Sequence, residues 1–325
     1  MTDIAPILIL VLPCYNEAEL LPRSIPRIMQ SAHSAAAARG WQLRAILVND
    51  GSSDASATLL DQLASQDARL QVLHFTRNFG KEAALFAGLE HALVLPGAAA
   101  VATIDADLQH PPELLQPMLA AHAQGYQIAE AVKQQRGPES LTRRCLAKPF
   151  YHLFERASGL PLGGHTDYKL LDIRVVHQLV GMRERGRFYR GLVAWLGHAS
   201  VHIPFDVPPR PGGRSQWSRL GLVRYAWGNL LTFSTIPLRA VTWLGVLGLA
   251  VGAAGGLKSL WDYFSGRAST GFTTVILLQI LFGGLILIAL GLIGQYLGRI
   301  YEEVKARPHY ALRASAPPHL PTPHD

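Results

Sequence analysis

The sequence predicts an α/β protein with a mostly parallel sheet, followed by a pair of membrane-spanning helices. In the first half of the chain, apolar runs alternate with amphipathic segments, and a polar cluster follows each run. Strands separated by helices indicate βαβ units and a parallel sheet. Hydrophobic residues make up 49% of the 325 residues and charged residues only 16%. This balance suggests that part of the chain contacts lipid.

Four apolar runs have the length and composition of buried strands, and three amphipathic segments between them have the periodicity of helices. The predicted strands are residues 7–12, 43–48, 70–75 and 98–104, and the predicted helices are residues 17–38, 54–67 and 81–95. Residues 136–168 are basic and are expected to be irregular, with a helical stretch after them. Two cysteines in a chain of this length predict no disulfide framework.

Two stretches near the C-terminus are long enough to cross a bilayer. The 18 residues between Arg239 and Lys258 carry no charge, and neither do the 31 residues between Arg267 and Arg299. A spanning helix needs about 20 predominantly apolar residues, so both stretches qualify. Two buried helices of a soluble core are the alternative, but a charge-free stretch of 31 residues is longer than such helices usually are.

Basic residues flank both outer ends of this hairpin, and positive charge next to a span favours the cytoplasmic side. They are Arg214, Arg219, Arg224 and Arg239 before the first span and Arg299, Lys305, Arg307 and Arg313 after the second. We expect a multi-pass protein of the inner (cytoplasmic) membrane, with its N-terminal domain and both termini in the cytosol. The first residues lack the basic region and the apolar length of a signal peptide.

These features divide the chain into four parts. We expect an α/β domain at 1–213, interfacial juxtamembrane helices at 214–239, the two spans at 240–298, and a tail at 299–325 with a disordered end. Glycines recur every fourth residue within the spans, which allows close helix packing inside the hairpin or between subunits of a homo-oligomer. The net charge of +7 lies largely near the spans, where anionic lipid explains it better than nucleic acid.

Polar clusters follow all four predicted strands, and the carboxyl ends of parallel strands meet at one edge of a sheet. The most informative cluster contains Asp105 and Asp107, one residue apart at the end of an apolar run. Two such carboxylates can hold Mg²⁺ or Mn²⁺ on a diphosphate. Aspartate at a strand end also serves turns, so the pair alone is a weak signal. Together, the four clusters predict one binding site.

The motifs in these clusters resemble, in order and spacing, family 2 glycosyltransferases of the dolichyl-phosphate mannose synthase and bacterial polyprenyl-phosphate (bactoprenol) glycosyltransferase type. They are Leu12-Pro13-Cys14-Tyr15-Asn16-Glu17, Asn49-Asp50-Gly51-Ser52-Ser53-Asp54, Arg77-Asn78-Phe79-Gly80-Lys81-Glu82-Ala83-Ala84 and Asp105-Ala106-Asp107-Leu108-Gln109. The resemblance extends to Arg307-Pro308-His309-Tyr310. It implies a nucleotide-sugar-binding domain of the GT-A type with a mostly parallel sheet.

The resemblance also implies contacts with a nucleotide sugar. Asp50 is assigned to the base, in a pocket lined by Pro13, Tyr15 and Glu17. A carboxylate can accept a hydrogen bond from a base N–H, although an Asx-turn capped by Asp54 is the alternative at this turn. Lys81 is expected to contact phosphate, or else to be a solvated residue at a helix start. Arg210, in an Arg-x-x-Gly-x-Ser pattern, is expected to close over the diphosphate.

The resemblance also implies which residues bind the metal and the acceptor. Asp105 is expected to contact the ribose or the metal-bound phosphates, with Asp107 as a metal ligand and Gln109 as a further oxygen ligand of Mg²⁺ or Mn²⁺. His110 stands where relatives often have Asp, so no acidic role is expected there. Arg136 and Arg143 suit a polyprenyl phosphate acceptor, because arginine binds phosphate with two parallel hydrogen bonds. Asp167 is the family's acidic position near the acceptor.

The expected activity is inverting transfer of one sugar from a nucleotide sugar, with a UDP-sugar as the expected donor, to undecaprenyl or another polyprenyl phosphate. The acceptor phosphate is largely ionised at neutral pH and can attack directly, so positioning supplies much of the rate. One alternative is a processive polysaccharide synthase, although the sequence lacks the Gln-x-x-Arg-Trp motif of such enzymes. Another is a catalytically silent membrane scaffold that binds a nucleotide sugar.

Overall fold

The computed structural model describes residues 5–134, 164–206, 236–267 and 271–313. They fall into two compact units. The first is the α/β domain together with residues 308–313, which return to it after the last helix. The second contains the two long C-terminal helices.

The α/β unit is built on a seven-stranded sheet with the strand order β3-β2-β1-β4-β6-β5-β7. The strands are β1 (Ile7–Cys14), β2 (Gln42–Asn49), β3 (Leu70–His74), β4 (Ala98–Thr103), β5 (Ile128–Lys133), β6 (His165–Asp172) and β7 (Ser200–Phe205). Only β6 runs antiparallel to its neighbours among these strands. The prediction of a mostly parallel sheet is confirmed, and the sheet is mixed.

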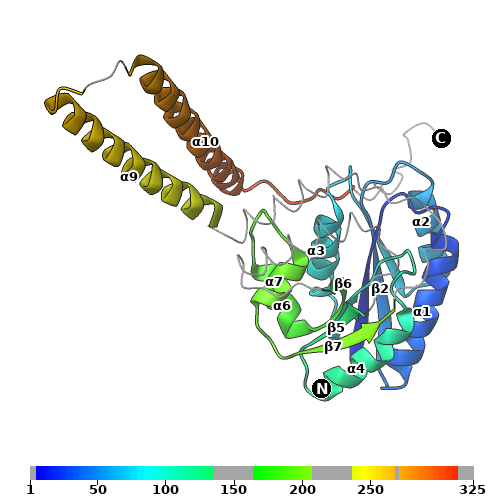
Figure 1. Ribbon diagram of the computed structural model, residues 1–325. Coiled ribbons are helices and arrows are strands. Elements are labelled where there is room, and N and C mark those ends of the chain that lie inside the picture. Colours follow the sequence, from blue (N-terminus) through cyan, green and yellow to red (C-terminus); the bar gives the residue numbers. More distant parts are fainter. Residues whose placement is uncertain (1–4, 135–163, 207–235, 268–270, 314–325) are drawn as a thin grey trace, which may run out of the picture. The chain divides into compact units, whose positions relative to one another are not determined.

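Helices cover both faces of this sheet (Figure 1). On one face lie α1 (Leu21–Ala37), α2 (Ser56–Gln66) and α4 (Leu115–Ala123), and on the other lie α3 (Lys81–Ala92), α6 (Ile173–Gly181) and α7 (Tyr189–Trp195). A short 3₁₀ helix, η1 (Pro112–Leu114), precedes α4. Because the central strands are covered on both sides, β1 is buried along nearly its whole length, as a continuous apolar run predicts.

The four predicted strands and three predicted helices are confirmed, with ends displaced by a few residues. Helix α1 begins at Leu21 instead of residue 17, because the amides of Leu20 and Leu21 both bond to the Glu17 carbonyl in a turn before the helix. The prediction of irregular chain up to Tyr168 is wrong for its last residues, since His165 already begins strand β6. Residues 135–163 lie outside the described chain.

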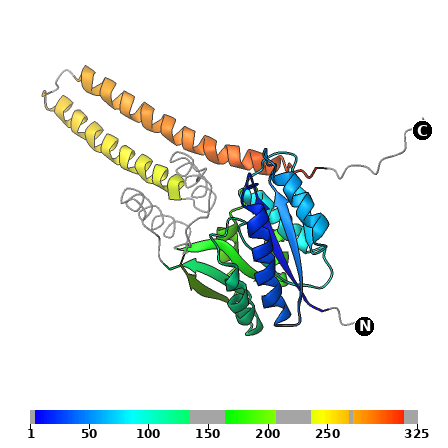
Figure 2. The same ribbon diagram turned by 90° about the vertical axis from the view of Figure 1, so that its right-hand side faces the viewer.

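The second unit is a hairpin of two long helices, α9 (Ile236–Phe264) and α10 (Phe272–Val304), which lie side by side (Figure 2). Both are long and apolar enough to cross a membrane by length and composition. A Cβ at Gly248 would lie 3.3 Å from the Phe282 ring, and one at Gly252 would lie 3.7 Å from it. These two glycines therefore receive a side chain of the partner helix within the hairpin.

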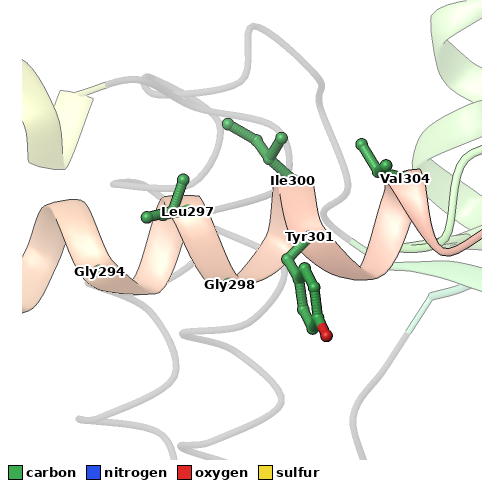
Figure 3. Close-up of a pocket in the computed structure, with 6 residues that line it drawn as sticks. All are labelled: Gly294, Leu297, Gly298, Ile300, Tyr301 and Val304. Atoms are coloured by element: carbon green, nitrogen blue, oxygen red, sulfur yellow. The ribbon is translucent and has the colours of Figure 1, made fainter.

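The glycines of α10 have a different environment. Gly294 and Gly298 line a shallow groove on α10, and a Cβ at either glycine would meet no other atom within 4 Å among the described residues (Figure 3). The other lining residues are Leu297, Ile300, Tyr301 and Val304. The lining of this groove is almost wholly apolar, in contrast to the polar loops of the α/β unit.

Candidate active site

The loops after β1 and β2 are joined by hydrogen bonds at the carboxyl edge of the sheet. The Asn16 amide donates to Ser52 Oγ at 3.0 Å, and the Glu17 amide donates to Ser56 Oγ at 2.9 Å. The Asp54 carboxylate accepts a hydrogen bond from the Ser56 amide at 3.0 Å. Asp54 therefore makes an Asx-turn at the start of α2, which is the alternative that the sequence left open at this turn. These bonds fix the two loops relative to each other.

Asp50 holds the loop that follows β3. Its carboxylate is buried and accepts hydrogen bonds from the amides of Phe79, at 2.7 Å, and Gly80, at 3.0 Å. Burial raises the pKa of Asp50, although these two hydrogen bonds oppose the shift. Gly80 has a φ of +98°, which favours glycine, and α3 starts at the next residue. Asp50 thus positions Lys81, and its contact with a base stays a prediction.

Lys81 lies between two carboxylates. Its Nζ is 2.6 Å from Asp105 Oδ1 and 2.7 Å from Asp167 Oδ2. Burial alone would lower the pKa of Lys81, but attraction to Asp105 and Asp167 outweighs burial and raises it. The same attraction lowers the pKa of Asp105 against the opposing effect of burial. The lysine is therefore a fixed positive charge at this edge of the sheet.

Arg190, in the first turn of α7, makes a bidentate ion pair with Asp167. Its Nε lies 2.6 Å from Asp167 Oδ1 and its Nη2 lies 2.9 Å from Oδ2. Thr103, the last residue of β4, donates a hydrogen bond to the Asp167 carbonyl. Burial would raise the pKa of Asp167, but Lys81 and Arg190 together hold it well below its usual range. Arg190 was not among the predicted site residues, because no sequence motif surrounds it.

Two further ionisable residues at this edge were also not identified. Glu82 accepts a hydrogen bond from the Tyr189 amide at 2.9 Å, and burial, followed by repulsion from Asp167, raises its pKa to about 7. Lys133 is the last residue of β5. Burial and then Arg190 lower the pKa of Lys133, while Asp105 and Asp107 oppose this shift. A lysine at a strand end is a signal that could have pointed to the site.

The second aspartate of the Asp-x-Asp pair begins a tight turn. Asp107 is buried, and its Oδ1 accepts a hydrogen bond from the Gln109 amide at 3.0 Å. Leu108 between them has a φ of +58°, which is unusual for a residue other than glycine. His110 is buried beside Tyr168, with ring centroids 5.4 Å apart, and its Nδ1 lies 3.7 Å from Asp105 Oδ2. Burial lowers the pKa of His110, against the opposing attraction of Asp105.

A second polar group lies on strands β5, β6 and β7. The possible ligand atoms of Glu130, His165 and His202 all lie within 4.8 Å of one another. However, Glu130 already accepts hydrogen bonds from His165, at 2.6 Å, and from the buried Lys169 ammonium. A divalent cation here would lie beside that positive charge, which disfavours it. We interpret this group as a buried ion pair with a histidine bonded to it.

The remaining predicted residues have different outcomes. Pro13, Tyr15 and Glu17 are partly buried; Pro13 is the penultimate residue of β1, and Tyr15 and Glu17 lie on the loop after it, at the same edge of the sheet as Asp50. Arg136, Arg143 and Arg210 lie outside the described residues, so their roles stay predictions. Of the predicted site residues in the described chain, the structure brings Lys81, Asp105 and Asp167 into direct contact.

Open α/β sheets bind their ligands at the carboxyl edge, and ionisable groups with shifted pKa values gather at functional sites, so this edge is the candidate active site. The family model described as glycosyl transferase family 2 matches residues 9–175. The chain therefore belongs to glycosyltransferase family 2, as the loop motifs predicted.

Relatives match nearly the whole chain. An uncharacterized glycosyltransferase of Synechocystis sp. is 35% identical, covering 93% of each chain. The SfII prophage-derived bactoprenol glucosyl transferase of Shigella flexneri is 32% identical, covering 94% of this chain and 97% of the relative. Among solved structures, a mannosyltransferase from Pyrobaculum calidifontis in complex with GDP-Man and Mn²⁺ is similar at 15% identity and a TM-score of 0.43. It covers 89% of this chain and 88% of that chain.

Proposed function

We propose that this glycosyltransferase moves one sugar from a UDP-sugar to undecaprenyl phosphate, or to another polyprenyl phosphate, at the cytosolic face of the inner membrane, with inversion at the sugar carbon. The main support is the arrangement of Lys81, Asp105, Asp167 and Arg190 at the carboxyl edge of the sheet. The bactoprenol glucosyl transferase of Shigella flexneri, similar over nearly its whole length, supports the lipid phosphate acceptor.

The residues at the sheet edge suit a divalent cation. Asp105 and Asp107 offer the hard oxygen ligands that Mg²⁺ and Mn²⁺ prefer, and Gln109 is the next polar side chain. Lys81 Nζ lies 2.6 Å from Asp105 Oδ1, so a cation here would share this carboxylate with the lysine. A cation held by Asp105, Asp107 and Gln109 would stabilise the charge that builds on the departing nucleoside diphosphate.

The protein's own residues bind and orient the two phosphorylated substrates. Lys81 and Arg190 present two fixed positive charges, and Asp167 holds both in position. Arg136 and Arg143 bind the acceptor phosphate, and Arg210 closes over the diphosphate of the donor. An ionised phosphate oxygen attacks without a strong general base, so alignment of the substrates supplies much of the rate.

The decisive experiment combines membranes that contain the protein with undecaprenyl phosphate and a panel of radiolabelled nucleotide sugars. We expect one UDP-sugar to label the organic phase, with a single sugar per lipid and a β-linkage from an α-linked donor. Asp107→Asn should abolish labelling, whereas Asp61→Asn, on an exposed surface carboxylate, should leave it unchanged. EDTA should stop the reaction, and added Mg²⁺ or Mn²⁺ should restore it.

Three outcomes of this experiment would contradict the proposal. Labelled polymer in place of a single sugar would indicate a processive polysaccharide synthase. Nucleotide-sugar binding without transfer from any donor would indicate a silent scaffold. Full activity after exhaustive chelation would exclude the role of the metal.

A further inference from the structure

The segment that follows α10 docks on the edge of the sheet. The Thr76 amide donates to the Ala311 carbonyl at 3.0 Å, and the Arg313 amide donates to the His74 carbonyl at 2.7 Å. Phe75 and Leu312 form an antiparallel β-bridge between these two bonds. Because β3 is an edge strand, residues 308–313 add backbone partners just beyond its carboxyl end.

Tyr310 in this segment reaches the loop before α3 through aromatic contacts. Its ring stacks on the buried Phe75, with centroids 5.0 Å apart and planes at 15°. Phe75 in turn contacts Phe79 edge to face, with centroids 5.6 Å apart. The Phe79 amide is one of the two that Asp50 holds, directly before Lys81. Tyr310 is thus connected to the turn that positions Lys81.

A second set of contacts connects Tyr310 with the start of α7. The Tyr310 hydroxyl donates to Glu90 Oε2 at 2.5 Å, and Glu90 Oε1 accepts from Arg187 Nη1 at 2.9 Å. The guanidinium of Arg187 is well covered and lies 4.4 Å from the centroid of the Phe86 ring. Arg187 precedes Arg190 by three residues, and Arg190 forms the ion pair with Asp167.

Both sets of contacts lead to the same carboxylate, because Lys81 and Arg190 are the two cations bound to Asp167. We propose that Tyr310 is a positioning residue that keeps Lys81 and Arg190 aligned on Asp167 when residues 308–313 are docked. The site is then complete only with the chain that follows the second long helix in place. This inference builds on the proposed function, since it assigns Lys81 and Arg190 to the substrate phosphates.

Tyr310 is suited to this role and is not a core residue. Its side chain is only partly buried, whereas the core of the unit is formed by residues of the sheet and of the helices that cover it. Its stacking partner, Phe75, is fully buried and is the residue that directly follows β3. Loss of the Tyr310 ring should therefore loosen the loop before α3 and leave the sheet intact.

The test uses the full-length protein in detergent and compares Tyr310→Leu, Tyr310→Phe and the control Tyr126→Leu. Tyr126 is an exposed tyrosine at the opposite end of the sheet, two residues before the start of β5. The first measurement is hydrogen exchange of the Phe79 and Gly80 amides. We expect Tyr310→Leu to speed their exchange at least tenfold, with the amides of β1 unchanged. Tyr310→Phe keeps the ring stack and should exchange as the wild type does.

The second measurement is the initial rate with UDP-glucose and undecaprenyl phosphate. We expect Tyr310→Leu to lower kcat/KM for UDP-glucose at least tenfold, with less than a twofold change in KM for the lipid. Tyr310→Phe should lower it about threefold, because it removes the hydrogen bond to Glu90. Glu90→Gln should lower it further, because it also removes the charge opposite the buried Arg187 guanidinium. Tyr126→Leu should match the wild type.

Wild-type exchange at Phe79 and Gly80 in Tyr310→Leu would overturn the inference. Equal acceleration of exchange at these amides and throughout β1 would also overturn it, because that pattern indicates a general loss of stability. If the wild type transfers no sugar from UDP-glucose or any other donor, the proposed function fails. The exchange measurement still decides whether Tyr310 positions the loop.

Discussion

Arg190 and Asp167 form a bidentate ion pair at the carboxyl edge of the sheet, with Arg190 Nε 2.6 Å from Asp167 Oδ1. The same carboxylate accepts a hydrogen bond from Lys81 Nζ at 2.7 Å. One buried carboxylate therefore sets the distance between two cations from different helices. This relationship makes Asp167 an organiser of the positive charge at the site.

We predict that Asp167→Asn lowers kcat/KM for sugar transfer at least 100-fold. The amide keeps the shape of the side chain but removes its charge, so Lys81 and Arg190 repel each other and lose their fixed positions. Steady-state kinetics in detergent measures the effect. Asp61→Asn, which changes an exposed carboxylate paired with His74, is the control and should cost less than twofold. Equal losses in both variants would refute this role for Asp167.

The buried pair of Glu130 and Lys169 predicts a large effect on stability. Glu130→Gln leaves the Lys169 ammonium buried without its counter-charge, which typically costs about 3–5 kcal/mol of unfolding free energy. Replacing both partners removes the stranded charge, so Glu130→Gln combined with Lys169→Met should recover most of this loss. Chemical denaturation of the purified protein measures both variants. A double variant less stable than Glu130→Gln would contradict this account.

Glu82 predicts a pH dependence of stability. Burial and repulsion from Asp167 raise its pKa to about 7, so the folded protein holds this proton more tightly than the unfolded chain does. The resulting stabilisation is complete below the ordinary glutamate pKa and is lost as the pH rises through about 7. Over that window it amounts to at most about 3 kcal/mol. The thermal midpoint of the wild type should fall between pH 5 and 8, and more steeply than that of Glu82→Gln. Parallel curves would refute the assignment.

Gly51 predicts a steric effect at the turn after β2. It has a φ of +63°, and a Cβ on it would lie 2.2 Å from the Arg77 carbonyl carbon. Gly125 provides a matched control, because its φ is +95° and a Cβ there meets nothing within 4 Å. Gly125→Ala should cost about 1–2 kcal/mol from backbone strain alone. Gly51→Ala adds a backbone clash and should cost at least about 2 kcal/mol more, measured by denaturation. Equal costs would contradict the close approach.

The first half of the fold could be predicted because its strands are buried on both faces. Such strands appear in the sequence as continuous apolar runs, and β1 is the clearest case. Strand β6 was missed because Asp167, Lys169 and Asp172 give it the composition of a surface loop. Its charges are neutralised by partners from other elements, such as Glu130 on β5. Pairing of this kind is not visible in local sequence.

The site was also predicted only in part. Asp105 lies in the loop after β4, and Lys81 begins α3 at the end of the loop after β3, so the position of each along the chain indicates the edge of the sheet where it lies. Arg190 and Glu82 are held there by tertiary contacts with Asp167 and Tyr189, and no spacing rule reveals such contacts. Asp50 was expected to face a base, and the structure adds its bonds to the Phe79 and Gly80 amides.

The bridge between Phe75 and Leu312 joins residues that are far apart in the chain. During translation, β3 leaves the ribosome long before residues 308–313 exist, and both long apolar helices are made in the interval. The edge of the nascent domain acquires its last backbone partner only after those helices have been synthesised. The α/β domain of a growing chain is thus completed late, when the hydrophobic hairpin is already available for insertion into a membrane.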